Sequence, residues 1–235
     1  MIDEEKKPKT EVEKPPIGAV IFDLDGLLID SEPLWSEGRR QILAQYGVAY
    51  TMKEKKMTMG GDYRTGVAYL VKHYNLPLTI DEYAEREKQL LDRLYKQGLQ
   101  LMPGVVEFFD KLDQVQIAKA IATSSSRKRL NMVMKLVRLG SFDAIVTGDE
   151  IRDGKPAPDI FLKVAEKLNI DPETCVVLED SPLGIMAARA AGMKTVAIYD
   201  SRFTSEEDFQ SQSKPDLIVN SLRGLDIEKL GAMVK

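Results

Sequence analysis

The sequence predicts an α/β fold in which a doubly wound parallel sheet carries an inserted, all-helical domain. After residue 103, strand-like and helix-like segments alternate, a pattern typical of βαβ units. Between residues 31 and 102 the pattern is helical and polar, although a buried strand precedes it. We therefore expect a Rossmann-like core of residues 17–30 and 103–235, a helical cap domain of residues 31–102, and a disordered tail of residues 1–16.

The first core strand is expected at residues 18–22, because Ala19-Val20-Ile21-Phe22 is a short apolar run with β-branched residues. Similar runs predict later strands at residues 119–122, 144–147, 175–178 and 195–199, with an edge strand at 216–219. Helices are expected between them at residues 127–139, 159–168 and 183–191. Pro158 stands just before the second of these helices and Gly192 just after the third, which are preferred positions for these residues.

Helices in the insertion are expected at residues 35–46, 63–74 and 80–95, where apolar residues recur at three- and four-residue spacing. Thr79 and Glu82 predict a capping box at the start of the last of them. Ligands of an open parallel sheet bind beyond the carboxyl ends of its strands. Because both linkers of the insertion leave near that edge, we expect the helical domain to close over the site as a lid.

Composition and charge argue against several kinds of partner. The net charge of −4 gives no electrostatic reason to expect nucleic acid or an anionic membrane. No apolar run approaches the roughly 20 residues of a membrane helix, and the first residues lack the apolar core of a signal peptide. Cys175 is the only cysteine, so an intramolecular disulfide is impossible and a reducing cytoplasm is the expected location.

Two of the predicted strands end abruptly in acidic residues. Asp23 and Asp25 follow the first strand, and Glu179 and Asp180 follow the strand at 175–178. Carboxylates at the ends of buried strands are costly unless they are paired or bound to a metal. The two acidic pairs therefore predict one site that holds a hard cation.

Other polar residues are expected at the same edge of the sheet. Thr123 and Ser124 follow the strand at 119–122, and Lys155 lies in the loop before the helix at 159–168. The set contains carboxylates, hydroxyls and a lysine but no histidine or cysteine. It suits oxygen-bound magnesium and a phosphate group, and it does not suit zinc or thiol chemistry.

Four segments in order along the chain resemble the motifs of the haloacid dehalogenase superfamily. They are Phe22-Asp23-Leu24-Asp25-Gly26, Ala122-Thr123-Ser124, Gly154-Lys155-Pro156-Ala157-Pro158-Asp159 and Leu178-Glu179-Asp180-Ser181. The resemblance covers nearly all of the chain after the tail, and the insertion falls where the helical cap of that family falls. Four ordered motifs are far more specific than a single Asp-x-Asp.

The resemblance implies distinct roles for the first two acids. Asp23 is the expected nucleophile, which attacks phosphorus to give an aspartyl-phosphate. Asp25 is the expected general acid, which protonates the leaving oxygen and then acts as the base that activates water. Gly26 would allow the sharp departure of the chain after the strand.

The resemblance also implies how the phosphoryl group is held. Mg²⁺ would be bound by Asp23, the backbone carbonyl of Asp25 and Asp180, with Glu179 at or near the coordination shell. Lys155 would place positive charge against the phosphoryl oxygens. The Thr123 hydroxyl and the Ser124 backbone N–H would donate hydrogen bonds to them.

Within the family, the segment from Phe22 to Trp35 is most similar to phosphatases of sugar phosphates, hexitol phosphates and pseudouridine 5′-phosphate. β-Phosphoglucomutases share the four motifs, and Arg64 falls where they have an arginine for a second phosphate. They have a histidine, however, where this chain has Trp35, and an indole cannot do the acid–base work of histidine.

The favoured function is therefore Mg²⁺-dependent hydrolysis of a small phosphomonoester, either a sugar phosphate or a nucleoside monophosphate. Phosphoryl transfer within a hexose phosphate is the alternative, and a non-catalytic binding protein on the same scaffold is a remote one. A small phosphorylated metabolite is the expected partner, and Trp35 and Arg64 are the candidate substrate contacts in the cap. A monomer is the default for an enzyme whose two domains close.

Overall fold

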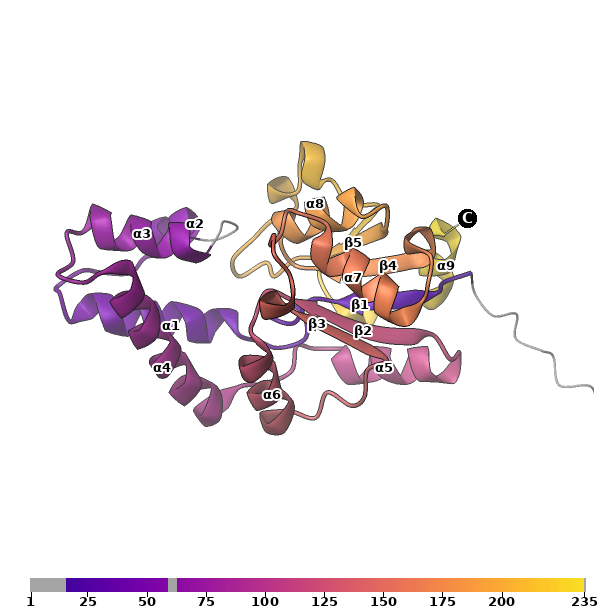
Figure 1. Cartoon of the computed structure of the whole chain (residues 1–235), viewed down its shortest axis with the longest axis horizontal. Helices are drawn as coiled ribbons and strands as arrows, with labels where there is room; N and C mark the ends of the chain where they lie inside the picture. Colours follow the sequence, from indigo (N-terminus) through magenta and orange to yellow (C-terminus); the bar gives the residue numbers. More distant parts are fainter. Residues whose placement is uncertain (1–15, 59–62, 235) are drawn as a thin grey trace, which may run out of the picture.

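The computed structural model describes residues 16–58 and 63–234. The predicted tail therefore lies almost wholly outside the described residues. Two parts are visible in Figure 1: a sheet flanked by helices, and a group of helices at one end of it. In the described residues no helix is both long and apolar enough to cross a membrane.

The sheet has six parallel strands in the order β3-β2-β1-β4-β5-β6. They are β1 (Ala19–Phe22), β2 (Ala118–Thr123), β3 (Ala144–Thr147), β4 (Cys175–Glu179), β5 (Lys194–Ile198) and β6 (Leu217–Val219). Strand β1 pairs with β2 on one side and β4 on the other, so the chain order reverses at the centre of the sheet. The prediction of a doubly wound parallel sheet is confirmed, and the reversal marks the expected ligand edge.

Helices cover both faces of the sheet because successive residues of a strand point to opposite sides. Val20 and Phe22 pack on one face with residues of α5 (Val105–Gln114), α6 (Arg127–Leu136) and α9 (Ile227–Met233). Ala19 and Ile21 pack on the other with α7 (Asp159–Leu168) and α8 (Pro182–Ala190). Short 3₁₀ helices lie at Gly148–Glu150, Pro172–Thr174, Glu206–Asp208, Ser211–Ser213 and Leu222–Gly224.

Some predicted helix boundaries are wrong, and three helices are not among the predicted elements. Helix α6 ends at Leu136 rather than at residue 139 because Val137 is extended, and Val137 and Leu139 both pack into the core. Helices α5 and α9 were not predicted, although the buried residues of α5 follow three- and four-residue spacing. Helix α2 (Met52–Thr58) lacks an apolar stripe, since the residues it buries, Glu54, Lys55 and Thr58, are polar.

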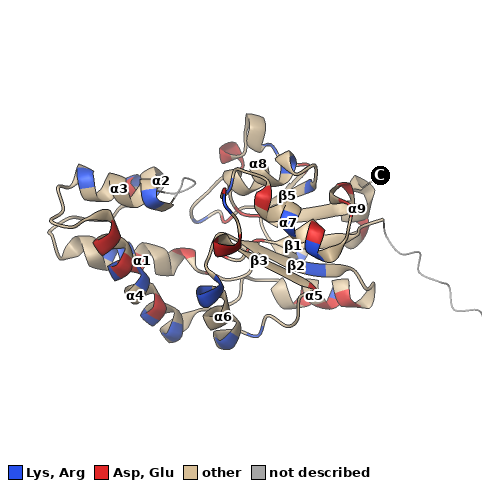
Figure 2. Ribbon diagram, in the orientation of Figure 1, with Lys and Arg blue, Asp and Glu red and all other residues tan. Residues whose placement is uncertain are grey.

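The inserted helices form a second hydrophobic core. They are α1 (Glu32–Ala44), α2, α3 (Tyr63–His73) and α4 (Ile80–Gly98). Ile42, Val67, Leu70 and Tyr83 are buried together among them. The predicted capping box is confirmed, since the Thr79 side chain accepts from the Glu82 backbone and the Glu82 side chain accepts from Thr79. Acidic and basic residues are interspersed on the helices of both parts (Figure 2).

The two linkers of the insertion pair with each other beside the end of β1. The Asp30 backbone N–H donates to the carbonyl of Gln100 at 2.9 Å, and that of Met102 donates to Leu28 at 3.0 Å. Ile29 and Leu101 form an antiparallel bridge between these bonds. We propose that this paired segment is the hinge between core and cap, with the cap spanning residues 31–102.

Candidate active site

Most of the predicted site residues line one cavity of about 1720 Å³ at the carboxyl end of the sheet. Those in its lining are Asp23, Asp25, Trp35, Thr123, Ser124, Lys155 and Asp180. Residues of α1, α4 and α6 also line it, so the cavity lies between the core and the inserted helices. Glu179 and Arg64 are not among the lining residues.

Lys155 forms ion pairs with two of the predicted acidic residues. Its ammonium donates to Asp23 Oδ1 at 2.6 Å and to the Ala122 carbonyl at 3.3 Å, and it also pairs with Glu179. Only 8% of its side chain is exposed. Burial alone would lower the pKa of Lys155, but the two carboxylates outweigh it and raise that pKa, so the ammonium stays charged. Lys155 therefore links the acidic side chains at the ends of the paired strands β1 and β4.

Glu179 lies beneath the cavity rather than in its wall. Its side chain is fully buried, and Oε2 accepts from the Ser181 backbone N–H at 3.2 Å and from the Ser181 hydroxyl at 2.9 Å. Gly184 of α8 allows the close approach, because a Cβ atom there would lie 1.9 Å from the carboxyl carbon of Glu179. In this arrangement Glu179 forms an ion pair with Lys155 on the side away from the cavity.

We expect Gly184→Ala to destabilise the protein by about 1–3 kcal/mol, because the new methyl group overlaps a buried, ion-paired carboxylate. Urea unfolding measures the change. Gly98→Ala is the matched control, since Gly98 is an exposed helical glycine with no atom within 4 Å of the added Cβ. Gly184→Ala with the stability of the wild type would contradict the tight packing described above.

Asp180 approaches the loop after β1 because Gly26 leaves room for it. Gly26 has a φ of +81°, and a Cβ there would lie 2.2 Å from Asp180 Oδ2. Burial, Glu179 and Asp23 raise the pKa of Asp180, and burial likewise raises that of Asp23 against the pull of Lys155. The two carboxylates thus share a desolvated corner in which negative charge is under-compensated.

This corner fits a hard divalent cation by its chemistry and charge. Asp23, Glu179 and Asp180 supply three carboxylates to the single ammonium of Lys155, and their donor atoms are all oxygen. Over residues 16–58 and 63–234, no three acidic, histidine or cysteine side chains form a ready-made metal cluster. The fit therefore depends on Asp23 and Asp180 at the cavity surface and on the excess of negative charge.

The loop after β2 offers hydrogen-bond donors to an anion. Thr123 Oγ1 accepts from the Ser125 backbone N–H at 3.0 Å, which leaves its own proton available. Ser126 caps α6 by accepting from the Arg129 backbone N–H at 3.3 Å. Thr123 and Ser124 therefore stand just before a helix N-terminus, a position that favours phosphate.

Two residues outside the predicted set contact Asp25. The Tyr95 hydroxyl donates to Asp25 Oδ1 at 3.0 Å, and the Ser125 hydroxyl donates to Oδ2 at 2.8 Å. Ser125 belongs to a serine run whose sequence signal is a helix cap. Tyr95 carries no sequence signal beyond helical spacing, because its contact spans 70 residues.

The two candidate substrate contacts of the cap differ in position. Trp35 lines the cavity, and the guanidinium carbons of Arg39 and Arg129 lie 5.8 and 5.0 Å from its ring centroid. Arg64 instead pairs with Asp81 at 2.8 Å, with 64% and 79% of these side chains exposed. The structure thus keeps Trp35 at the cavity and places Arg64 at the surface.

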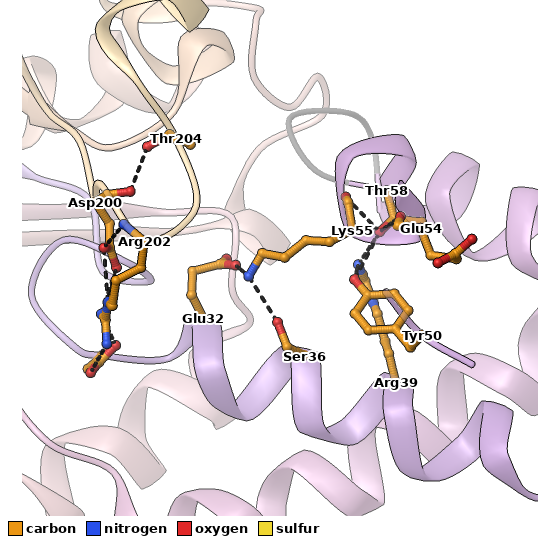
Figure 3. A network of polar contacts seen from close by, with 11 residues as sticks. Glu32, Ser36, Arg39, Tyr50, Glu54, Lys55, Thr58, Asp200, Arg202 and Thr204 are labelled. Carbon is orange, nitrogen blue, oxygen red and sulfur yellow. Dashed lines mark hydrogen bonds and ion pairs between the residues drawn. The ribbon is translucent and has the colours of Figure 1, made fainter. Parts of the chain in front are cut away.

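A polar network forms another wall of the cavity (Figure 3). Lys55 reaches from α2 to Glu32 Oε2 at 2.8 Å and to Ser36 Oγ at 2.9 Å, both on α1. Its ammonium also lies 3.4 Å from the ring centroid of Phe203, in the core. Nearby, Arg202 pairs with Asp30 in the linker. On this side, the cap therefore contacts the core domain through the Lys55 ammonium and the Phe203 ring.

Comparison with known proteins identifies relatives of the chain. Residues 20–198 match the family model for haloacid dehalogenase-like hydrolases. A phosphorylated carbohydrates phosphatase of Thermotoga maritima is 34% identical over 211 residues, covering 87% of this chain and 98% of that protein. Hexitol phosphatase B of Escherichia coli is 35% identical, covering 77% and 82%. The solved structure of a HAD hydrolase, family IA, variant 3, from Entamoeba histolytica superimposes with a TM-score of 0.81 at 26% identity, covering 93% and 99%.

Proposed function

Because the chain belongs to the haloacid dehalogenase-like hydrolase family, we propose that it hydrolyses a small phosphomonoester through an aspartyl-phosphate on Asp23. The observation that carries the proposal is the convergence of Asp23, Asp25, Lys155 and Asp180 on one cavity between core and cap. The relatives named as carbohydrate and hexitol phosphatases support a phosphorylated carbohydrate as substrate. The polar wall of Glu32, Ser36 and Lys55 suits its hydroxyl groups, and a nucleoside monophosphate is the other candidate.

In the first step, a carboxylate oxygen of Asp23 attacks phosphorus, and the bond from phosphorus to the leaving alcohol oxygen breaks. Asp25 donates its proton to that oxygen, so the alcohol departs neutral. In the second step, Asp25 takes a proton from water, whose oxygen attacks the phosphoryl group. The bond between Asp23 and phosphorus then breaks and releases inorganic phosphate. Lys155, the Thr123 hydroxyl and the Ser124 backbone N–H stabilise the charge on the phosphoryl oxygens.

Magnesium is the proposed cofactor. Asp23, the Asp25 backbone carbonyl and Asp180 would hold the ion, and Glu179 would stand behind them as the partner of Lys155. A bound divalent ion would supply the positive charge that allows an anionic carboxylate to approach an anionic phosphate. The raised pKa of Asp23 is consistent with this need, because a nucleophile must be ionised.

Two observations disfavour the mutase alternative. Arg64 pairs with Asp81 at the surface of the cap and does not line the cavity. Trp35 occupies the cavity wall at the position for which the mutases have a histidine. The non-catalytic alternative is disfavoured because each acid and the lysine of the four motifs is present. Transfer of the phosphoryl group to water, rather than to a second sugar hydroxyl, is therefore the proposed reaction.

The test is a phosphate-release screen over hexose, pentose, polyol and nucleoside monophosphates. We expect release from at least one alkyl phosphate in the presence of Mg²⁺, loss of release in EDTA, and recovery when Mg²⁺ is restored. Contaminating phosphatase is controlled by preparing Asp23→Asn in parallel. Inactivity of the wild type across the panel would refute the proposal. Strict dependence on a bisphosphate primer would instead support phosphoryl transfer within a hexose phosphate.

A further inference from the structure

The carboxyl group of Asp25 receives one hydrogen bond on each oxygen, from two different parts of the molecule. Tyr95 approaches Oδ1 from α4 of the cap, and Ser125 approaches Oδ2 from the loop after β2 of the core. A carboxyl group rotates easily about its last side-chain bond, because that torsion has only broad minima. Two donors on opposite oxygens remove this freedom.

Tyr95 can hold a core residue from the cap because it lies beside the hinge. It is 1% exposed and stands one turn before Gly98, where α4 ends, and the chain then enters the paired linker. A residue close to a pivot moves little when the two parts rotate. Its position is also fixed by packing in the main core cluster, which includes Leu28 and Leu91.

The Tyr95 phenol is a hydrogen-bond donor at working pH. A phenol with an ordinary pKa of about 10 stays protonated near neutral pH. This hydroxyl donates to Asp25 Oδ1. Replacing Tyr95 by Phe therefore removes one donor with almost no change in volume.

Ser125 connects Asp25 to Thr123 at the end of β2. Its backbone N–H donates to Thr123 Oγ1 at 3.0 Å while its hydroxyl donates to Asp25. A serine hydroxyl can also rotate and accept a hydrogen bond. Ser125 can thus remain in contact with Asp25 both when the carboxyl group has given up its proton and when it carries one.

We propose that Tyr95 and Ser125 are positioning residues that orient the Asp25 carboxyl group for proton exchange with the leaving oxygen and then with water. The inference rests on the proposed function, in which Asp25 is the acid and base. Proton transfer requires heavy atoms at about 2.6–3.2 Å, and small misplacements reduce the rate steeply. The contribution of the pair should therefore depend on how much the leaving group needs a proton.

The test compares two substrates whose leaving groups differ in that need. One is the alkyl phosphate that the wild type hydrolyses best, and the other is p-nitrophenyl phosphate, whose leaving group departs as a stable anion. For Tyr95→Phe we expect phosphorylation of Asp23 by the alkyl substrate to slow about 10-fold. The burst of p-nitrophenolate should change less than about 2-fold, and KM should change little. Rapid-quench and stopped-flow measurements give the two rates.

Tyr83→Phe is the matched control. Tyr83 lies on the same helix and is as buried as Tyr95, but its hydroxyl has no hydrogen-bond partner in the described structure. The Tyr83→Phe variant should leave both rates unchanged. The double variant Tyr95→Phe/Ser125→Ala should phosphorylate Asp23 from the alkyl substrate about 100-fold more slowly than the wild type. Thermal unfolding verifies that each variant is folded.

Equal loss on both substrates, or no loss on either, in a folded Tyr95→Phe variant would overturn the inference while leaving the proposed function intact. A wild type that released phosphate from neither substrate would instead refute the proposed function itself, and the inference with it.

Discussion

Asp23→Asn is expected to reduce phosphate release by at least about 10⁴-fold, which is the scale of loss when a nucleophile is removed. An amide nitrogen or oxygen does not attack phosphorus to form the acyl-phosphate, and it carries no charge to help hold a cation. Because Asn has nearly the size of Asp, Lys155 keeps its second partner, Glu179. The measurement is phosphate release with the best substrate of the screen.

The same variant should remain folded. Burial raises the pKa of Asp23, so above its unfolded value the ionised carboxylate costs the folded, metal-free protein free energy. That cost grows as pH rises above the pKa of Asp23 in the unfolded chain, and it is fully present above the pKa of Asp23 in the folded protein. The neutral amide of Asn avoids this cost. In EDTA at neutral pH, Asp23→Asn should therefore unfold at a temperature no lower than the wild type.

Asp110→Asn, on the exposed side of α5, is the control for loss of an acid elsewhere and should keep full activity. Substantial turnover by Asp23→Asn would mean that another group attacks phosphorus.

Lys155→Met is expected to damage both catalysis and stability. Loss of its charge removes a contact to the phosphoryl oxygens, which should lower kcat/KM by about 10²–10³-fold. It also leaves Glu179 fully buried and Asp23 nearly buried, each without its cationic partner. Breaking a buried ion pair costs about 3–5 kcal/mol, so the free energy of unfolding in urea should fall by that amount.

A double-mutant cycle separates these effects. In a Glu179→Gln background the buried charge that Lys155 leaves behind is smaller, so Lys155→Met should cost less stability there than in the wild type. Lys229→Met on the exposed side of α9 should change stability by less than about 0.5 kcal/mol. Equal costs in both backgrounds would show that Lys155 and Glu179 do not stabilise each other.

Much of the fold follows from local patterns. The strand at Ala19–Phe22 and the acids after it were predictable because burial selects apolar β-branched runs, and a parallel sheet puts the ends of such runs at one edge. The Thr79–Glu82 cap was predictable because its partners lie within one helical turn. Helix α2 escaped prediction because its buried face is polar, and hydrophobic periodicity cannot register buried Glu54 or Lys55.

The sequence by itself determined the chemical repertoire of this protein: the acids, the lysine and the hydroxyls, and the sheet edge on which they stand. Only the tertiary structure decided which of these groups contact one another. Glu179 proved to lie beneath Lys155, Arg64 at the surface, and Tyr95 and Ser125 on Asp25. The contacts of Glu179, Tyr95 and Ser125 span 24, 70 and 100 residues, and the Arg64–Asp81 pair depends on helix packing in the cap. No local periodicity encodes such contacts. They arise when strand pairing and hinge geometry bring remote side chains together.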